Sequence, residues 1–167
     1  MRNRLNLIRL LAAFTVLLIH SIPIYGLDNT FFPRIGLAGE MAVMVFFAIS
    51  GYLITGSYLG ATSCRQYLLN RVLRIFPGLL GVIVFSIMLG ACVTTLPVDQ
   101  YFHNINTWSY LQNILLYPQV GILPGVFEIN PIPLALNGSL WTLRIEFTMY
   151  LLIPGLGALK LLTQKRI

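Results

Sequence analysis

The stretch FPGLLGVIVFSIMLGACVTTL, residues 76–96, decides the fold of this chain because it contains no charged side chain. A helix of this length crosses a hydrocarbon core of roughly 30 Å. Three further apolar stretches, at about 5–25, 37–59 and 140–162, have similar lengths. The sequence therefore predicts an all-α fold, a multi-pass transmembrane helical bundle with about four full spans in one domain, 1–167.

The composition of the 167 residues also indicates a membrane protein, since 57% are hydrophobic and only 10% are charged. Soluble domains carry about a quarter charged residues. The net charge is +6, but the positive residues stand at the ends of the apolar stretches, so we do not expect nucleic-acid binding. Cys64 and Cys92 match neither a metal-ligand nor a disulfide spacing, and we interpret them as free thiols without a metal.

The distribution of Lys and Arg predicts the orientation of the spans. Basic residues precede the first span, separate the second from the third, and follow the last: Arg2, Arg4, Arg65, Arg71, Arg74, Lys160, Lys165 and Arg166. These ends are expected on the cytoplasmic side, with the N-terminus inside and the chain in the cell membrane.

The region 97–138 contains no Lys or Arg and is expected on the outer side. Its most apolar part, 108–117, is too short to span the membrane, and prolines interrupt the sequence after it. We predict a short interfacial or re-entrant segment followed by a loop. A crossing in this region would put the basic C-terminus outside, and is the less favoured alternative.

Arg9 and His20 are the first candidates for a functional site, because ionisable residues inside spans are costly. They lie eleven residues apart, so they share one helix face about 16 Å apart along its axis. The alternatives are a snorkelling arginine and a hydrogen-bonded structural histidine.

Glu146 shares a helical stripe with Tyr150 and Ser139. If the last span starts at the outer surface, Glu146 lies about 10 Å below it, near the expected depth of His20. A carboxylate beside an imidazole fixes its tautomer and stabilises the imidazolium in general-base catalysis. A structural salt bridge is the alternative.

Arg71 and Arg74 are three residues apart before the third span. A pair of guanidinium groups on one helix face suits a phosphate-rich ligand, although ordinary positive-inside charge explains the same spacing. In the second span, Ser50 stands among small and aromatic residues, where it could line a site or serve helix packing.

Four segments in order resemble motifs of the acyltransferase 3 family. They are Arg9 with His20, Phe46 to Leu53, Arg71 to Pro77, and Asn137 to Leu143 with Glu146 and Tyr150. The resemblance implies a membrane O-acyltransferase that moves an acyl group, often acetyl, from cytoplasmic acyl-CoA to a hydroxyl of a surface or membrane-linked carbohydrate.

The same resemblance implies residue roles. His20 would be the catalytic histidine with Arg9 in its motif, and Arg71 and Arg74 would lie near the phosphates of CoA. Glu146 would support the catalytic site, and Ser50 and Tyr150 would line it. The expected partners are the lipid bilayer, acyl-CoA as co-substrate and the acceptor, with no bound cofactor.

Domains of this family are usually about twice this length, so we expect a truncated domain. The sequence leaves open whether this domain is active by itself. The alternatives are a non-catalytic fragment, one half of an enzyme completed by a second chain, or a transporter component that uses the buried charges as a relay. Inverted repeats would favour transport, and the sequence shows none.

Overall fold

The computed structural model describes residues 2–24, 32–130 and 136–162. In these ranges the chain forms helices and turns with no β-strand, which confirms the all-α prediction. The predicted end of the first span at Tyr25 and the basic residues Lys165 and Arg166 lie outside the described residues. The chain divides into two compact units, Met1–Gly60 and Ala61–Ile167, and each is described by itself.

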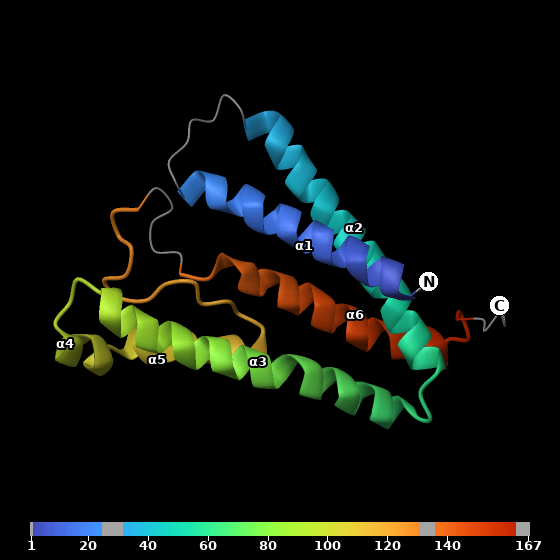
Figure 1. Cartoon of the computed structure of the whole chain (residues 1–167). Coiled ribbons are helices and arrows are strands. Elements are labelled where there is room, and N and C mark those ends of the chain that lie inside the picture. Colours follow the sequence, from blue (N-terminus) through green and yellow to red (C-terminus); the bar gives the residue numbers. More distant parts are fainter. Residues whose placement is uncertain (1, 25–31, 131–135, 163–167) are drawn as a thin grey trace. The chain divides into compact units, whose positions relative to one another are not determined.

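The first unit consists of helices α1 (Arg2–Ile24) and α2 (Phe32–Leu59). They lie side by side (Figure 1) and run antiparallel, since Gly39 contacts Ile19 while Phe46 contacts Arg9. A Cβ atom at Gly39 would meet Ile19 Cγ2 at 3.2 Å. The absence of a side chain at Gly39 therefore lets the two helices approach closely, as is common between membrane helices.

The second unit is organised along α3 (Cys64–Val93). This helix begins at Ser63, whose hydroxyl accepts a hydrogen bond from the Gln66 amide at 3.1 Å. The predicted span began at residue 76, whereas α3 begins at Cys64. The basic segment with Arg71 and Arg74 is therefore part of the same helix as the apolar span. At about 1.5 Å per residue, α3 is about 45 Å long, which exceeds the hydrocarbon core.

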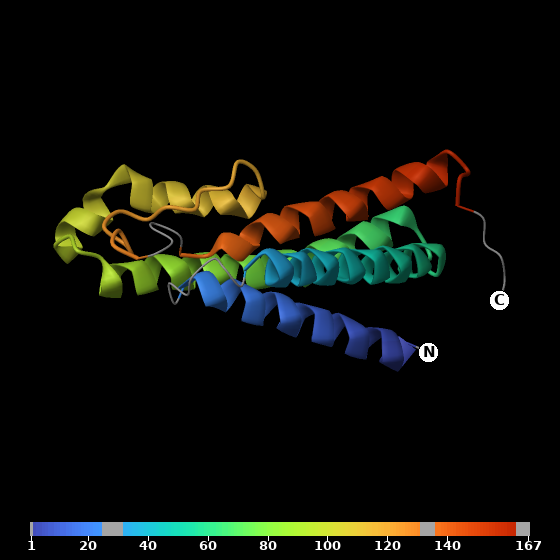
Figure 2. The ribbon, with the colours of Figure 1, turned by 90° about the horizontal axis from the view of Figure 1, so that it is seen from above.

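A hairpin segment, residues 97–126, leaves the end of α3 and returns to it. It contains α4 (Val98–His103), α5 (Ile105–Ser109) and the 3-10 helix η2 (Tyr110–Leu115). Helix η2 packs on α3, and α5 leads into η2 (Figure 2). At the return, the Thr94 hydroxyl donates to the Pro124 carbonyl at 2.8 Å and the Thr95 amide donates to the Gly125 carbonyl at 2.9 Å. Both ends of the hairpin segment therefore lie at the same end of α3.

Buried hydrogen bonds hold the hairpin segment together. The Asn113 side-chain amide donates to the carbonyls of Tyr110 and Val120, and its oxygen accepts from the Val120 amide. The Tyr101 hydroxyl donates to the Ile87 carbonyl of α3 at 3.0 Å. A Cβ atom at Gly90 would overlap that hydroxyl, so only glycine fits where α4 crosses α3.

The last two helices described are the 3-10 helix η3 (Gly138–Leu140) and α6 (Trp141–Ala158). Helix α6 packs on α3. The rings of Phe76 and Phe147 meet edge to face, with centroids 5.5 Å apart. Helix α6 has only 18 residues and carries Arg144 and Glu146 in its first two turns.

By length and composition, three described helices can cross a membrane: Arg4–Ile22, Gly36–Leu59 and Cys64–Val93. These three segments agree with the first three predicted spans. The fourth predicted span, 140–162, forms α6, which is not among the three, so the count of four is not confirmed. Two charged side chains in so short a helix explain the difference.

Candidate functional site

In the first unit, His20 has one defined hydrogen bond. Its Nδ1 atom lies 2.8 Å from the carbonyl oxygen of Val16, one turn earlier in α1. A carbonyl oxygen only accepts hydrogen bonds, so Nδ1 is the donor in this contact. In the neutral tautomer that fits the contact the lone pair is on Nε2, and the His20 side chain is exposed within this unit.

Arg9 lies on the same helix but interacts with α2. Its guanidinium carbon Cζ is 4.9 Å from the centre of the Phe46 ring, a cation–π contact. Its buried Nε atom has no hydrogen-bond partner among the described residues. Three helical turns separate Arg9 from His20, so the two side chains share a face without touching.

Ser50 lies one turn after Phe46 on α2 and is fully buried, with a relative exposure of 1%. Its hydroxyl oxygen also lacks a hydrogen-bond partner within the described ranges. Native proteins seldom leave buried polar atoms unsatisfied. Arg9 and Ser50 thus give the first unit two buried polar atoms that a ligand, a water molecule or another part of the protein must satisfy.

In the second unit, four of the predicted site residues come together. Arg71 of α3 places its Cζ atom 5.4 Å from the centre of the Tyr150 ring of α6. The Tyr150 hydroxyl donates a hydrogen bond of 2.5 Å to Oε1 of Glu146. Arg74 stands three residues after Arg71 on the same side of α3. We call Tyr67, Arg71, Arg74, Glu146 and Tyr150 the arginine cluster.

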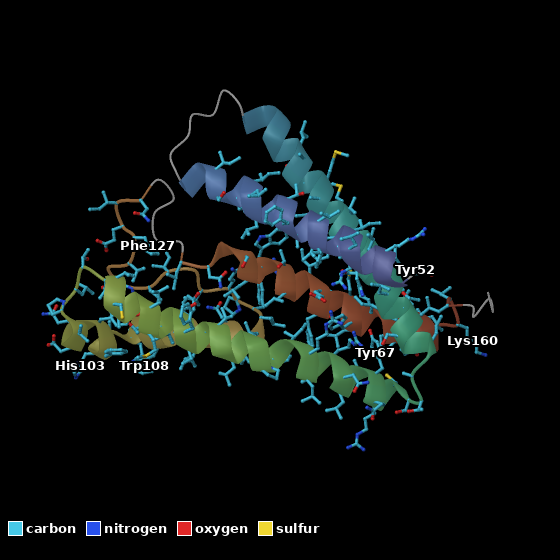
Figure 3. The ribbon with its side chains drawn as sticks, in the orientation of Figure 1. Tyr52, Tyr67, His103, Trp108, Phe127 and Lys160 are labelled. Carbon is cyan, nitrogen blue, oxygen red and sulfur yellow. The ribbon has the colours of Figure 1, made fainter. Side chains whose placement is uncertain are left out.

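Tyr67 is the member of the arginine cluster that sequence reasoning missed. Its ring lies 5.6 Å from the Arg71 Cζ atom and has a relative exposure of only 1%. Figure 3 labels Tyr67 on the part of α3 that is alongside α6. The spacing of four residues between Tyr67 and Arg71 was the available signal, because it puts both on one helix face.

The arginine cluster also fixes the level of Glu146 relative to α3. Tyr150 meets Arg71 and Phe147 meets Phe76 in antiparallel helices, so Glu146 lies near the level of residues 76–77. That level is about 18–20 Å from the beginning of α3 and about 24–26 Å from its end. The sequence-based depth of Glu146 assumed that α6 starts at the outer surface, whereas α6 starts beside the middle of α3. The predicted pairing of Glu146 with His20 stays a prediction, as the two belong to different units.

The electrostatic character of the arginine cluster suits an anionic ligand. Two guanidinium groups stand on one side of α3, and the one carboxylate among them accepts a hydrogen bond from Tyr150. The two aromatic rings beside Arg71 restrict its orientation while they leave its charge in place. No group of three or more His, Cys, Asp or Glu side chains within the described residues could hold a metal ion.

Comparisons with known proteins agree with the sequence motifs. The sequence model of the acyltransferase 3 family, described as an acyltransferase domain, matches residues 2–167. The chain is 30% identical over 152 residues to an O-acetyl transferase of Shigella phage Sf6, covering 90% of this chain. It is 28% identical over 171 residues to nodulation protein 10 of Rhizobium leguminosarum bv. viciae, covering 93% of this chain. No solved structure matches it.

The chain spans 44% of the length of each of these two curated relatives.

Proposed function

Because this chain belongs to the acyltransferase 3 family, we propose that it is part of a membrane O-acyltransferase. It transfers an acyl group, acetyl by analogy with the O-acetyl transferase of phage Sf6, from acyl-CoA to a hydroxyl of a surface or membrane-linked carbohydrate. The chain contributes the base and the site for the CoA phosphates, and it lies in the cell membrane with its N-terminus in the cytoplasm.

The observation that carries this proposal is that His20 lies within a helix able to cross a membrane, with its Nδ1 atom bound to the Val16 carbonyl. With Nδ1 held by the Val16 carbonyl, Nε2 of the neutral ring accepts the proton of the acceptor hydroxyl. The hydroxyl oxygen then forms a bond to the acyl carbon, and the carbon–sulfur bond of the thioester breaks. The CoA sulfur leaves with the electron pair and takes up a proton. Arg9, on the same face, contributes positive charge below the imidazole.

The arginine cluster supports the donor side of the proposal. Arg71 and Arg74 carry the charge needed to bind CoA phosphates, and guanidinium groups bind such oxygens bidentately. Tyr67 and Tyr150 orient Arg71, and Glu146 in turn holds the Tyr150 hydroxyl. Glu146 is therefore proposed as a positioning residue for the donor site. The basic end of α3 is the cytoplasmic end by the positive-inside rule, which is where acyl-CoA is available.

The test is acyl-CoA hydrolysis or transfer by the purified chain in lipid vesicles, compared with His20→Ala. We expect the variant to lose about 100-fold or more in rate, the usual contribution of a general base. His103→Ala is the matched control, because His103 Nδ1 makes the same bond to a backbone carbonyl, that of Asp99, at 2.6 Å. Its rate should equal that of the unmodified chain.

A folded chain with no activity in any variant would contradict catalysis by this chain alone. The next measurement is then addition of the part of the phage Sf6 relative that this chain does not match. Recovery of a His20-dependent rate would show that the chain is one part of the enzyme. Equal rates in the unmodified chain and His20→Ala would remove His20 from the chemistry.

A further inference from the structure

Glu40 is a charged residue that the proposed function does not use. It lies on α2 and is the only Asp, Glu, Lys or Arg in the apolar stretch Gly36–Leu59. It is also the only acidic side chain among the described residues of the first unit. An ionisable group in a helix able to cross a membrane is costly and usually has a partner. Glu40 therefore requires an explanation.

The contact between α1 and α2 gives the level of Glu40. Gly39, immediately before Glu40, packs on Ile19, immediately before His20, and a Cβ atom at Gly39 would lie 3.2 Å from Ile19 Cγ2. Because the helices are antiparallel, His20 and Glu40 are displaced from this contact in opposite directions, and lie about 3 Å apart along the helix axes. Side chains tilt toward the N-terminus of their own helix, which brings these two toward one level.

The same contact gives the side on which Glu40 stands. Successive residues of a helix point about 100° apart. The two antiparallel helices rotate in opposite senses when they are viewed from one end. With Ile19 and Gly39 facing each other, the next residue of each helix therefore points to the same side of the pair. His20 and Glu40 are these next residues, and both side chains are exposed within this unit.

The other candidate residues of the first unit share this side. Arg9 lies three turns from His20 on the same face, and Ser50, eleven residues after the glycine that contacts α1, is turned about 20° toward it. These two residues hold the buried polar atoms of the first unit that have no partner among the described residues. The opposite side carries exposed leucines, among them Leu11 and Leu18. The polar candidates thus gather where Glu40 stands.

We propose that Glu40 is the positioning residue for His20. This inference rests on the proposed function. With Nδ1 bound to the Val16 carbonyl, Nε2 takes the proton of the acceptor hydroxyl, and the Glu40 carboxylate pairs with the imidazolium that forms. The proton stays on Nε2 and the carboxylate keeps its charge. Rotation of the exposed Glu40 side chain brings it to the ring, since the two residues stand at one level on neighbouring helices.

Electrostatics favours this pairing. Opposite charges attract more strongly in a low-dielectric surrounding than in water, and an imidazolium within a span needs a nearby anion. Arg9 is the other charged group on this side, about 16 Å away along α1, and its positive charge opposes a second positive charge at His20. Glu40 offsets that opposition. The alternatives are Glu146, the partner that sequence spacing suggested, and a Glu40 carboxylate that only contacts water at the outer surface.

A distance measurement by solid-state NMR tests the pairing without turnover. The chain has two histidines, so His103→Ala leaves His20 as the only one. This chain is labelled with 15N in the histidine ring and 13C at the glutamate Cδ, in phosphatidylcholine vesicles at about pH 5.5, where ordinary imidazoles are protonated and ordinary carboxyls ionised. We expect dipolar coupling between Nε2 and a carboxylate carbon about 3–4 Å away, the separation that a charge-assisted hydrogen bond sets.

Substitutions assign the coupling to one of the three glutamates. Glu40→Gln should abolish it, whereas Glu146→Gln and Glu128→Gln, the matched controls, should keep it. Coupling that survives in Glu40→Gln and disappears in Glu146→Gln would overturn the proposal in favour of Glu146. The absence of coupling in the parent would also overturn it, and would leave Glu40 as a solvated carboxylate. The parent spectrum decides this even where a variant fails to fold, which circular dichroism detects.

The rate assay then tests whether the pairing serves the reaction. Glu40→Gln should lower kcat about tenfold to a hundredfold, the loss expected for a charge-assisted hydrogen bond. KM for acetyl-CoA should not change, because the carboxylate contacts His20 and not the donor. Glu40→Asp should restore part of the rate. In the His20→Ala chain, Glu40→Gln should have no further effect, since it acts through the imidazole.

The two readouts separate this inference from the proposed function. A coupling to Glu40 in a chain without activity would support the pairing while catalysis by this chain alone fails. A His20-dependent rate without coupling to Glu40 would keep the proposed function and overturn the inference. Coupling together with equal rates in Glu40→Gln and the parent would make the pair structural, and would overturn the positioning role.

Discussion

The two units of the chain place their functional groups in different ways. In the first unit, His20 takes its hydrogen-bond partner from its own helix, one turn away. In the second unit, Arg71 takes one aromatic neighbour from its own helix and the other from α6. The first arrangement depends on local helix geometry, whereas the second exists only when two helices distant in sequence pack together. Substitutions should therefore affect the two units differently.

The two histidines show what a local bond alone can establish. His20 and His103 both direct Nδ1 to a backbone carbonyl four residues earlier. The shared bond fixes the same tautomer in each, so it does not make a histidine functional. His20 differs because it lies within a helix able to span a membrane, while His103 lies in the short helix α4. Position in the fold distinguishes the two.

The largest effect among the changes to the second unit is expected at Arg71. Arg71→Ala should weaken acyl-CoA binding about tenfold to a hundredfold, since it removes charge-assisted hydrogen bonds to phosphate. The acyl-CoA affinity of Arg71→Lys should lie between that of Arg71→Ala and that of the unmodified chain, because lysine keeps the charge but loses the planar guanidinium. Isothermal titration with acetyl-CoA measures both. Arg65→Ala, exposed in the first turn of α3, is the control, and an equal loss there would show that net charge rather than the arginine cluster binds the donor.

A smaller effect is expected for the hairpin segment. Asn113→Ala removes three hydrogen bonds from a residue that is 3% exposed and leaves buried backbone groups unsatisfied. We expect a loss of about 2–4 kcal/mol of stability, measured by thermal unfolding in detergent. The exposed Asn106→Ala should change stability little. If both variants unfold alike, the Asn113 hydrogen bonds do not stabilise the hairpin segment.

The smallest effect is expected at a local feature, the start of α3. Ser63→Ala removes the acceptor for the Gln66 amide and should cost about 1 kcal/mol. Thr62→Ala, next to it and exposed, should cost less. The same unfolding assay compares them, and an Asn113→Ala loss no larger than that of Ser63→Ala would contradict the distinction between tertiary and local contacts.

Much of the fold could be predicted because membrane helices follow from local composition. The three helices able to span a membrane agree with three of the predicted apolar stretches. The prediction of a fourth span over 140–162 was not confirmed, because Arg144 and Glu146 shorten the apolar run of α6. Whether a helix with two charged side chains crosses a membrane depends on the groups around it, which the sequence does not show. The start of α3 at Cys64 was also missed. The basic residues in its first turns were used only to assign the orientation of the spans, so the segment was taken as a connection between spans.

For the candidate site, the sequence indicated residue types, and packing gave their partners. Arg71, Arg74, Glu146 and Tyr150 were predicted separately for donor and catalytic roles, and the structure brings them together in one cluster. Tyr67 was missed although its spacing of four residues from Arg71 was a signal, whereas the contact of Arg144 with Tyr117 could not be predicted. An aromatic ring near a guanidinium has no sequence signature when the two lie on different elements.

By itself, the sequence determined that this protein is a helical membrane protein of the acyltransferase 3 family, and it indicated His20 and the two arginines of α3 as candidates. Both conclusions rest on local order: hydropathy over about twenty residues, and motifs that each span fewer than fifteen residues. Only the tertiary structure decided that Tyr150, which holds Glu146, lies beside Arg71, and that Tyr117 reaches Arg144 near the middle of α3. These positions depend on where α6 and the hairpin segment pack along α3, and side-chain complementarity between distant segments sets that register.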